Sequence, residues 1–584
     1  MRNIAAFILI LLLGQQTTIN GQNTVATEAS EIQYLIVTPN DKGIRQWADT
    51  LARFRNEQGI YTEVISLSEI GENLPLTLKN YFKEFYNNQQ YKSLSAVLLF
   101  GDYDKDPSKG ITSFYLNNNY ETNVKYLSDN RLVDFNDDCL PDIVIARMPA
   151  ADAQQAELMV KKTIRYERHP SSNPDYYRQP VTAMGFQESR WFQLCSEVVA
   201  GYFEKAGKDP QRHNSIYEGL PDSVWSTAEN TDKIINYFGP KGLDYIPSDI
   251  RHLTDWDADE ETLSDAINSG TFLIQHRDHG DYQKWNNPHL SNEDINNLHN
   301  EDLTFVMSAN CRTGHFGYGE GDNDCLAERL LRIENGAVAV VAASEISYSF
   351  VNDTYVWGFY DYLWNDLIPS YGDNCIDFKY PAFANAYGKH FLHKSSWPYI
   401  SIHKDVTYDI MHYFGDAFLQ LNTEMPQNIE IYHPKEIKSD CNTFTIYKED
   451  KCRVAFSVDG KIIATSFADD TIIDIKPQLA GTKIKVVATK QDHYRYEGYI
   501  TVNSYLDNDD LKIYPNPAND IFFIESRGMK EIYIYNNLGQ MLMKTNNIEN
   551  HEKIDIDCRI LSRGLYHLHI IYDDKTVTKS FIKK

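Results

Sequence analysis

Basic side chains are scarce in this chain. Its 584 residues contain 56 lysines and arginines against 82 aspartates and glutamates, a formal net charge of −26 at pH 7. Proteins bind nucleic acid or anionic membranes through basic surfaces, so this balance argues against both as the main partner. We interpret the negative charge as a contribution to solubility outside a cell.

Cysteine and long apolar runs are also scarce. Eight cysteines are spread thinly, at positions 139, 195, 311, 325, 375, 441, 452 and 558. This spacing is not that of a disulfide framework, although Cys441 and Cys452 could pair within one small β-domain. After residue 22 no apolar run reaches the roughly 18 residues that span a bilayer, so we expect no transmembrane segment in the mature chain.

An apolar run does occur at the start of the chain. Arg2 precedes the apolar residues 4–13, and a polar stretch that ends near Gln22 follows. This order is typical of a secretory signal peptide. Residues 1–22 are therefore predicted to be a signal peptide, and the mature chain is predicted to be exported.

Apolar strands alternate with amphipathic helices over the first 200 residues. The pattern predicts strands at 32–37, 61–65, 96–100, 140–147 and 180–186, and helices at 44–58, 76–86 and 153–168. Another buried strand is expected at 336–344. Such alternation predicts an α/β fold with parallel sheets, and the length calls for three or four domains.

Two short segments carry the chemistry. Residues 273–280 and 305–312 are each an apolar run, too short for a helix, that stops at a reactive side chain, His279 in the first and Cys311 in the second. The carboxyl ends of parallel strands meet at one edge of a sheet, so we expect these two side chains to meet there. A thiol needs such a base or cation to become a nucleophile, whereas a lone cysteine after an apolar run is usually a buried small hydrophobe.

His279 has a rival in His276. Only His279 is followed by a glycine, Gly280, which lets the backbone approach a substrate carbonyl closely, so we favour His279. The two histidines do not predict a metal pair, because residues three apart on a strand point to opposite faces and the helical His-Glu-Xaa-Xaa-His pattern is absent. His315 could bind a metal together with Cys311, but we favour a surface-loop histidine.

At these residues the chain resembles the caspase-like cysteine peptidases, and the gingipain family in particular, in which a strand ending in His-Gly precedes a strand ending in a small residue and Cys. Residues 413–417, Tyr-Phe-Gly-Asp-Ala, also resemble that family's Phe-Gly-Asp-Pro segment. The resemblance implies an α/β, caspase-like catalytic domain of two parallel-sheet subdomains with flanking helices, residues 31–196 and 197–425.

The resemblance also implies roles for single residues. Cys311 is the expected nucleophile, and His279 is expected to protonate the leaving amine. The backbone N–H groups of Gly280 and Cys311 are the expected oxyanion hole. In gingipains an acidic residue beyond a strand orients the imidazole, and residues 181–188 match that stretch, which assigns the role to Glu188. A solvated carboxylate is the alternative reading of Glu188.

The substrate pocket departs from the arginine-specific gingipains. Those enzymes carry an aspartate at the base of the pocket, whereas counting back from Val198 places Phe192 there, next to Trp191. A pocket-wall tryptophan of the family matches Phe350. These three aromatics predict an apolar pocket and no preference for arginine or lysine, with core packing as the alternative.

The C-terminal part has the short alternating strands and turns of small β-sandwiches. Residues 426–503 predict one such sandwich, where gingipains commonly carry an immunoglobulin-like domain. Residues 511–584 predict another, and their Tyr-Pro-Asn-Pro at 514–517, Asn-Asn-Leu-Gly at 536–539 and Gly-Leu-Tyr at 564–566 resemble the C-terminal sorting domain of type IX secretion. Export through that machinery is implied by this resemblance alone.

No cofactor is expected to be required. The acidic stretches 134–138 and 320–324 could bind structural calcium, which gingipain-like domains often do, but neither fits the EF-hand pattern. A solvated turn is the interpretation that we favour for each stretch.

These observations predict a cysteine endopeptidase, secreted or attached to the outer surface of a Gram-negative bacterium, that cleaves proteins or peptides through a Cys-His dyad and an acyl-enzyme. Two alternatives stay open. One is an inactive surface adhesin or binding module on the same fold, and the other is a transpeptidase of the secretion system, which would share the acyl-enzyme. Autoinhibition by a large N-terminal prosegment is not expected, because about ten residues separate the predicted signal cleavage from the first strand.

Overall fold

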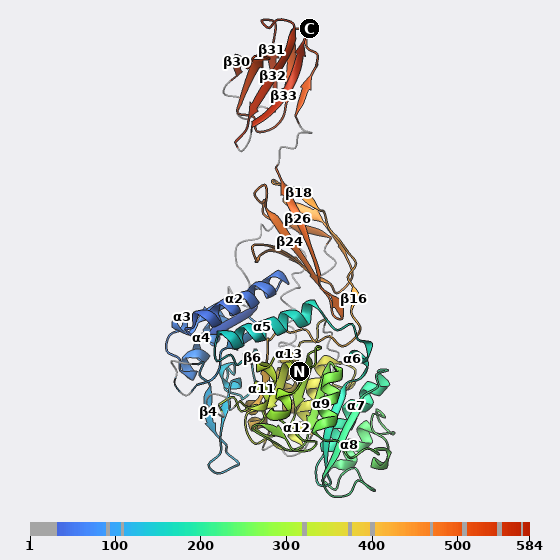
Figure 1. Ribbon diagram of the computed structural model, residues 1–584. Coiled ribbons are helices and arrows are strands. Elements are labelled where there is room, and N and C mark those ends of the chain that lie inside the picture. Colours follow the sequence, from blue (N-terminus) through green and yellow to red (C-terminus); the bar gives the residue numbers. More distant parts are fainter. Residues whose placement is uncertain are drawn as a thin grey trace. The chain divides into compact units, whose positions relative to one another are not determined.

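The computed structural model describes residues 32–88, 94–104, 106, 110–317, 324–371, 377–397, 403–467, 471–504, 511–545, 552–573 and 576–584. The predicted signal peptide and Cys375 lie outside these ranges. The chain divides into two compact units (Figure 1). The first runs to Tyr432 and includes residues 446–473 and 485–498, and the second comprises residues 433–445, 474–484 and 499–584.

A ten-stranded sheet forms the centre of the first unit, in the order β2-β1-β3-β6-β15-β14-β13-β9-β7-β8. The neighbouring strands pair in parallel, except that β15 runs antiparallel to β14. The strands are β1 Tyr34–Thr38, β2 Thr62–Ser66, β3 Ala96–Phe100, β6 Val144–Met148, β7 Val181–Gln187, β8 Gln211–Glu218, β9 Leu273–Arg277, β13 Thr304–Ser308, β14 Ala337–Ala343 and β15 Met411–Phe414.

Helices cover both faces of this sheet, because side chains alternate along each buried strand. In β1, Tyr34 and Ile36 belong to one core with α2 and α5, whereas Leu35 and Val37 belong to another with α4. The helices are α2 Lys42–Glu57, α3 Leu67–Ile70, α4 Pro75–Asn87, α5 Ala153–Arg168, α6 Pro174–Arg178, α7 Phe192–Lys205, α8 Thr231–Phe238, α9 Glu260–Ser269, α10 Asn292–Asn296, α11 Leu326–Arg332, α12 Val351–Leu363, α13 Pro381–Lys394 and α14 Lys404–Ile410.

The predicted α/β class is confirmed, and the eight strands expected between residues 32 and 344 all form. The two predicted halves share one sheet, because β15 lies between β14 and β6 and joins them. Strand β7, which precedes residue 196, lies between β8 and β9 among the strands of the second half. Two small antiparallel structures were not predicted: the hairpin of β4 Phe114–Asn117 and β5 Lys125–Ser128, and the sheet of β10 Gly280–Asp281, β11 Lys284–Trp285 and β12 Leu290–Ser291.

A buried polar network explains the Phe-Gly-Asp segment after β15. The hydroxyl of Tyr34 donates to Asp416 Oδ1 at 2.6 Å, and Arg55 Nε donates to Asp416 Oδ2 at 2.7 Å. Arg55 also donates to Glu167 at 2.7 Å. Since buried charges are tolerated when they are paired and hydrogen-bonded, Asp416 fixes the end of β15 to β1, α2 and α5.

Short strands follow the α/β part. They are β16 Gln427–Asn428, β17 Ile431–Tyr432, β18 Glu436–Lys438, β19 Thr443–Thr445, β20 Tyr447–Lys448, β21 Arg453–Val458, β22 Lys461–Ser466, β23 Ile472–Asp474, β24 Lys483–Thr489, β25 His493–Tyr494 and β26 Tyr496–Asn503. The Asp-Gly turn at 459–460 joins β21 and β22 into the expected hairpin. Cys441 and Cys452, the pair considered above, are both free thiols.

The end of the chain has a hydrophobic core of its own. Two antiparallel sheets, β27-β28-β31 and β30-β29-β32-β33, enclose Phe522, Ile534, Leu568 and Phe581. The strands are β27 Lys512–Tyr514, β28 Ile521–Glu525, β29 Glu531–Asn536, β30 Met541–Thr545, β31 Lys553–Asp557, β32 Gly564–Ile571 and β33 Thr576–Lys583. The prediction of a small two-sheet β-structure over residues 511–584 is confirmed.

Among the described helices, none has the length and apolar character needed to cross a bilayer.

Candidate active site

The carboxyl ends of adjacent strands carry the predicted catalytic side chains. Strand β9 lies between β13 and β7, with Ser308 opposite His276 and Met184 opposite Arg277. His279 follows β9 by two residues, and Cys311 follows β13 by three. Because these strands are parallel neighbours, both side chains reach one edge of the sheet, where they line the same cavity.

Cys311 is presented by a sharp turn. Arg312, the next residue, has φ of 62°, a left-handed conformation that is uncommon for residues other than glycine. Its side chain is fixed by Glu345, because Arg312 Nε donates to Glu345 Oε1 at 2.6 Å and Arg312 N donates to the carbonyl of Glu345 at 3.2 Å. The loop after β14 therefore holds the turn in which the thiol lies.

The thiol itself meets the same loop. Ser347 N donates to Cys311 Sγ at 3.4 Å, and the Ser347 hydroxyl lies 3.8 Å from the sulfur. Asn352 Nδ2 donates to that hydroxyl at 2.7 Å and fixes it. The sulfur also lies 3.7 Å from the Ser347 carbonyl oxygen, so the backbone of Ser347 holds it through both its N–H and its carbonyl group.

Gly280 is required by close packing. A Cβ at this position would lie 2.6 Å from Asn310 Oδ1 and 3.0 Å from the carbonyl oxygen of Cys311. A side chain would therefore push the His-Gly segment away from the Cys311 turn. The predicted oxyanion donors, the N–H groups of Gly280 and Cys311, are held on either side of this contact.

His279 is oriented by an amide. Its Nε2 lies 3.0 Å from Gln187 Oε1, and Gln187 Nε2 donates to Glu218 Oε2 at 2.8 Å. Because an amide oxygen only accepts, His279 must carry a proton on Nε2. The neutral imidazole therefore has Nδ1 as the nitrogen that exchanges a proton.

Glu188, which was predicted to orient His279, packs elsewhere. Strand β7 ends at Gln187, and Glu188 is the first residue beyond it. Glu188 lies against Gly219, where a Cβ would come within 2.8 Å of Glu188 Oε2. Within the described part of the chain it is Gln187 that contacts the imidazole, and an orienting role for Glu188 stays a prediction. Sequence reasoning missed Gln187 because it searched for a carboxylate.

The surroundings of His279 favour its neutral form. Burial lowers the pKa of His279, and the positive charges of Arg277 and Arg190 lower it further, whereas Glu218 raises it. Aromatic rings hold the imidazole on two sides, with the Phe192 centroid at 5.4 Å and the Tyr217 centroid at 4.5 Å. These contacts restrict the ring to one orientation.

The cavity beside the dyad has a volume of about 380 Å³. Two of the three predicted pocket aromatics, Phe192 and Phe350, line it. Trp191 does not. It is buried behind the wall, where its ring packs against Phe350 at 4.8 Å and its Nε1 donates to Thr231. The other lining residues include Glu121, Arg190, Arg277, Asp278, residues 346–349, Val351 and His403.

Phe350 adopts a strained conformation at the start of α12. Its φ is 71°, and its N–H donates to Asp353 Oδ2 at 2.8 Å. The other oxygen of Asp353 accepts from Arg277 Nε at 2.6 Å. Asp353 therefore positions both a ring and a cation of the cavity, and the strain at Phe350 is sustained by this bond and by the Trp191 contact.

His276 is structural. It is buried and stacked on Trp285 with ring centroids 4.4 Å apart, its Nε2 lies 3.1 Å from the Asn287 carbonyl, and its Nδ1 accepts from Asn310. Burial lowers the pKa of His276 to about 3, so the ring is neutral. Its hydrogen bond to Asn310 holds the residue that precedes Cys311. The choice of His279 over His276 agrees with this geometry.

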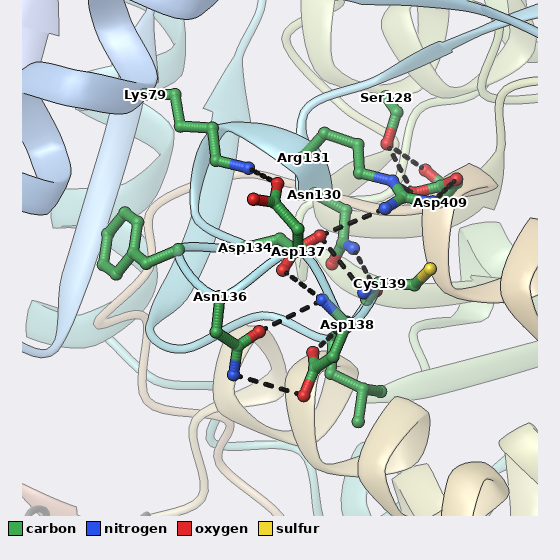
Figure 2. A network of polar contacts seen from close by, with 12 residues as sticks. Lys79, Ser128, Asn130, Arg131, Asp134, Asn136, Asp137, Asp138, Cys139 and Asp409 are labelled. Carbon is green, nitrogen blue, oxygen red and sulfur yellow. Dashed lines mark hydrogen bonds and ion pairs between the residues drawn. The ribbon is translucent and has the colours of Figure 1, made fainter.

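The acidic stretch 134–138 forms a loop whose oxygens accept bonds from its own backbone (Figure 2). Asp134 Oδ1 and Asn136 Oδ1 both accept from Asp138 N at 3.1 Å, and Asp138 Oδ1 accepts from Leu140 N at 3.0 Å. Asp137 pairs with Lys79. The solvated turn stays the favoured interpretation of this stretch, with structural calcium as the alternative.

The other predicted metal residues are placed as follows. In the stretch 320–324, residues 320–323 lie outside the described part, and Asp324 pairs with Arg332 at 2.5 Å. His315, which was favoured as a surface-loop residue, is partly buried, and its Nδ1 contacts the Ser344 carbonyl. Within the described ranges, no cluster of three or more His, Cys, Asp or Glu side chains is arranged to hold a metal ion.

Known proteins match the α/β part of the chain and its C-terminal β-structure separately. Residues 512–584 match the secretion system C-terminal sorting domain. Gingipain R2 of Porphyromonas gingivalis strain W83 is 21% identical over 482 residues, which cover 78% of this chain and 55% of that protein. A Gingipain R1 of Porphyromonas gingivalis is 22% identical over 306 residues, 50% of this chain and 25% of that protein. The chain thus spans about half the length, or less, of these relatives.

Solved structures agree on the fold. The crystal structure of the Arg-specific cysteine proteinase gingipain R (RGPB) matches with a TM-score of 0.64 at 17% identity, over 82% of this chain and all of that chain. The complex of the Porphyromonas gingivalis RgpB pro- and mature domains gives the same score over 81% of this chain. The family model of peptidase family C25 matches residues 27–422, more than half of the chain, and the chain therefore belongs to that family.

Proposed function

We propose that this protein is a secreted cysteine endopeptidase that hydrolyses protein substrates through Cys311 and His279. One observation carries the proposal. The thiol and the imidazole line one cavity at the carboxyl edge of the sheet, with His279 Nε2 bound to Gln187. Membership of peptidase family C25 supports it.

The reaction follows from the positions of the groups. The Cys311 thiol gives its proton to His279 Nδ1, and the thiolate attacks the carbonyl carbon of the scissile peptide. The N–H groups of Gly280 and Cys311 donate to the oxygen that becomes negative, a contribution of about 3 kcal/mol when donors are preorganised. His279 then protonates the leaving amine, and the carbon–nitrogen bond breaks to leave a thioester on Cys311.

Deacylation repeats these steps with water. His279 Nδ1 removes a proton from a water molecule, the resulting hydroxide attacks the thioester, and the thiolate leaves with the peptide acid released. If an amine took the place of water, the same thioester would give transpeptidation. We favour hydrolysis, since the chain belongs to a peptidase family.

Export is the second part of the proposal. Residues 512–584 match the secretion system C-terminal sorting domain and form a β-structure with a separate core. We propose that type IX secretion machinery recognises this part and delivers the protein to the outer surface or the medium of a Gram-negative bacterium. A non-catalytic adhesin is less favoured, because the fixed tautomer of His279 and the close packing at Gly280 would serve no purpose in binding alone.

A peptide-cleavage assay with a Cys311→Ala control tests the function. Purified protein is given a fluorogenic library that varies at the residue before the cut, with and without added amine acceptors, and with calcium or a chelator. Cleavage by the native protein that the substitution abolishes supports the peptidase. Ligated products in place of hydrolysed ones would support the transpeptidase, and no reaction under any condition would favour the binding module. A rate that depends on calcium would support calcium binding at residues 134–138 over the solvated turn that we favour there.

A further inference from the structure

We propose that the catalytic cavity selects substrates with an acidic side chain, aspartate or glutamate, at the residue before the scissile bond, and that Arg190 and Arg277 bind its carboxylate. This inference rests on the peptidase activity proposed above and names its substrate class. It departs from the uncharged, apolar pocket that the aromatic residues predicted.

Arg277 is a fixed donor in the cavity wall. It is 2% exposed, its Nε donates to Asp353, and its Nη1 donates to the Ala309 carbonyl at 3.0 Å. Its guanidinium carbon lies 4.1 Å from the centre of the Phe192 ring. The remaining nitrogen, Nη2, is buried and has no oxygen or nitrogen partner among the described residues, although the guanidinium also contacts the buried thiol of Cys195. Since a buried charged donor without a partner is costly, this N–H group is positioned for an acceptor that a substrate would bring.

Arg190 brings a second donor to the same wall. It lies in the loop between β7 and α7, is partly buried, and lines the cavity with Arg277. Its Nε is buried and, within the described part of the chain, has no hydrogen-bond partner. Both guanidinium groups also lie close enough to His279 to lower its pKa. Two arginines with unused N–H groups on one cavity are suited to a carboxylate, which accepts from planar guanidinium donors in pairs.

The two acidic residues of the cavity do not offset this arrangement. The carboxylate of Asp278 is pressed against β7, since a Cβ on Gly185 would lie 2.8 Å from both Asp278 oxygens. Those oxygens therefore lie over the strand rather than toward a substrate. Burial raises the pKa of Asp278 to about 7, so it carries less than a full charge at neutral pH. Glu121, the other acid, is exposed and well solvated.

The rings of the wall strengthen the selection. Phe192 and Phe350 give the cavity apolar walls beside the guanidinium groups, and electrostatic attraction is stronger next to apolar surface than in bulk water. The cavity of about 380 Å³ is ample for an aspartate or glutamate side chain. A site that offers hydrogen bonds to a carboxylate discriminates against the matching amide, because the amide supplies no charge and one fewer acceptor.

The test compares peptides that differ only in the residue before the cut: Asp, Asn, Glu, Gln, Arg, Lys, Phe and Leu. We expect kcat/KM for Asp or Glu to exceed that for its amide by about tenfold or more, the range of hydrogen bonds to charged groups. Arg190→Gln should lower the value for the acidic peptide about tenfold more than the value for the amide peptide. Arg190→Lys should lie between the two, since it keeps the charge and loses the planar donors.

Arg178→Gln is the matched control, because Arg178 is an exposed arginine on α6 that pairs with Asp175 and Asp209. It should leave every kcat/KM unchanged. Faster cleavage after Arg or Lys would overturn the inference and point to Asp278 instead, and a preference for Phe or Leu that Arg190→Gln leaves unchanged would overturn it in favour of an apolar pocket. Cleavage with no acidic preference removes this inference alone, whereas no cleavage of any peptide removes the proposed function with it.

Discussion

At the scale of residues, the proton affinity of His279 is set by a neutral partner. Gln187 accepts from His279 Nε2, and the nearest described carboxylate in that chain of bonds, Glu218, is one residue further away. A carboxylate directly on the imidazole would hold the protonated form more strongly. The amide supplies no such charge and the two arginines lower the pKa of His279, so in the proposed reaction a protonated imidazole would readily release its proton to the leaving amine.

Replacing Gln187 by Glu should raise the pKa of His279. The lowered pKa of the native imidazole would move up by about one pH unit, the usual effect of an adjacent carboxylate. Because kcat/KM falls as the free imidazole becomes protonated, the acid limb of its pH profile should shift upward by the same amount. Glu188→Gln is the control and should leave the limb in place. If Glu188→Gln shifted the limb and Gln187→Glu did not, the assignment would return to Glu188.

Asp278→Asn should stabilise the protein at alkaline pH. The folded pKa of Asp278, about 7, lies above its unfolded value near 4, so the native chain loses stability as pH rises through this window. Asparagine does not ionise, so the variant does not lose stability over this pH range. We expect it to be more stable than the native protein by about 3 kcal/mol at pH 8, with the difference gone by pH 4. Denaturant unfolding at several pH values measures this, and a difference independent of pH would contradict it.

At the scale of elements, α12 positions the cavity from its first turn. Asp353 accepts from Phe350 N and from Arg277 Nε, so one carboxylate caps the helix and fixes a buried cation. Removal of one partner from a buried ion pair costs more than the pair contributes, because the other charge is left without compensation.

Asp353→Asn should therefore lower the free energy of unfolding by about 3 kcal/mol. Denaturant unfolding gives the value. Asp175→Asn removes one partner of an exposed pair and should cost less than about 1 kcal/mol. Equal effects of the two substitutions would show that the Asp353 contacts do not carry this energy.

Buried strands were the most predictable elements. The strand predicted at 96–100 and the helix predicted at 153–168 match β3 and α5 residue for residue. A strand buried on both faces and an amphipathic helix each leave a strong pattern in the sequence. The antiparallel β15 was not predicted, since its place between β14 and β6 depends on contacts far apart in the chain. Gln187 was missed for a different reason: the search was for a carboxylate, and a glutamine at the end of a strand carries no such signal.

At the scale of the whole molecule, the sequence motifs indicated the α/β part and the terminal β-structure, because each carries its own hydrophobic pattern. They could not indicate that both halves of the α/β part share one sheet. Nor could they indicate the two arginines of the cavity, since buried charges in an apolar strand leave no periodic signal. Arg277 would have been found by asking why a strand that is otherwise buried contains a guanidinium.

Removal of residues 505–584 should leave peptide cleavage unchanged within about twofold. The cavity residues belong to the first unit, whereas β27 to β33 enclose a separate core. The shortened protein should be expressed but should be absent from the medium and from the cell surface. Fractionation of the cells and the medium measures this distribution. Normal export of the shortened protein would contradict a sorting role for this part.

The turn around Cys311 has a consequence for the laboratory. Its shape depends on Gly280, Arg312 and Glu345, while the thiol contributes weak contacts with Ser347. Alanine at position 311 should thus leave the cavity intact but unable to form a thioester. Such a variant would bind its natural substrates without cleaving them. Crosslinking the variant to proteins outside the cell would then capture those substrates for identification.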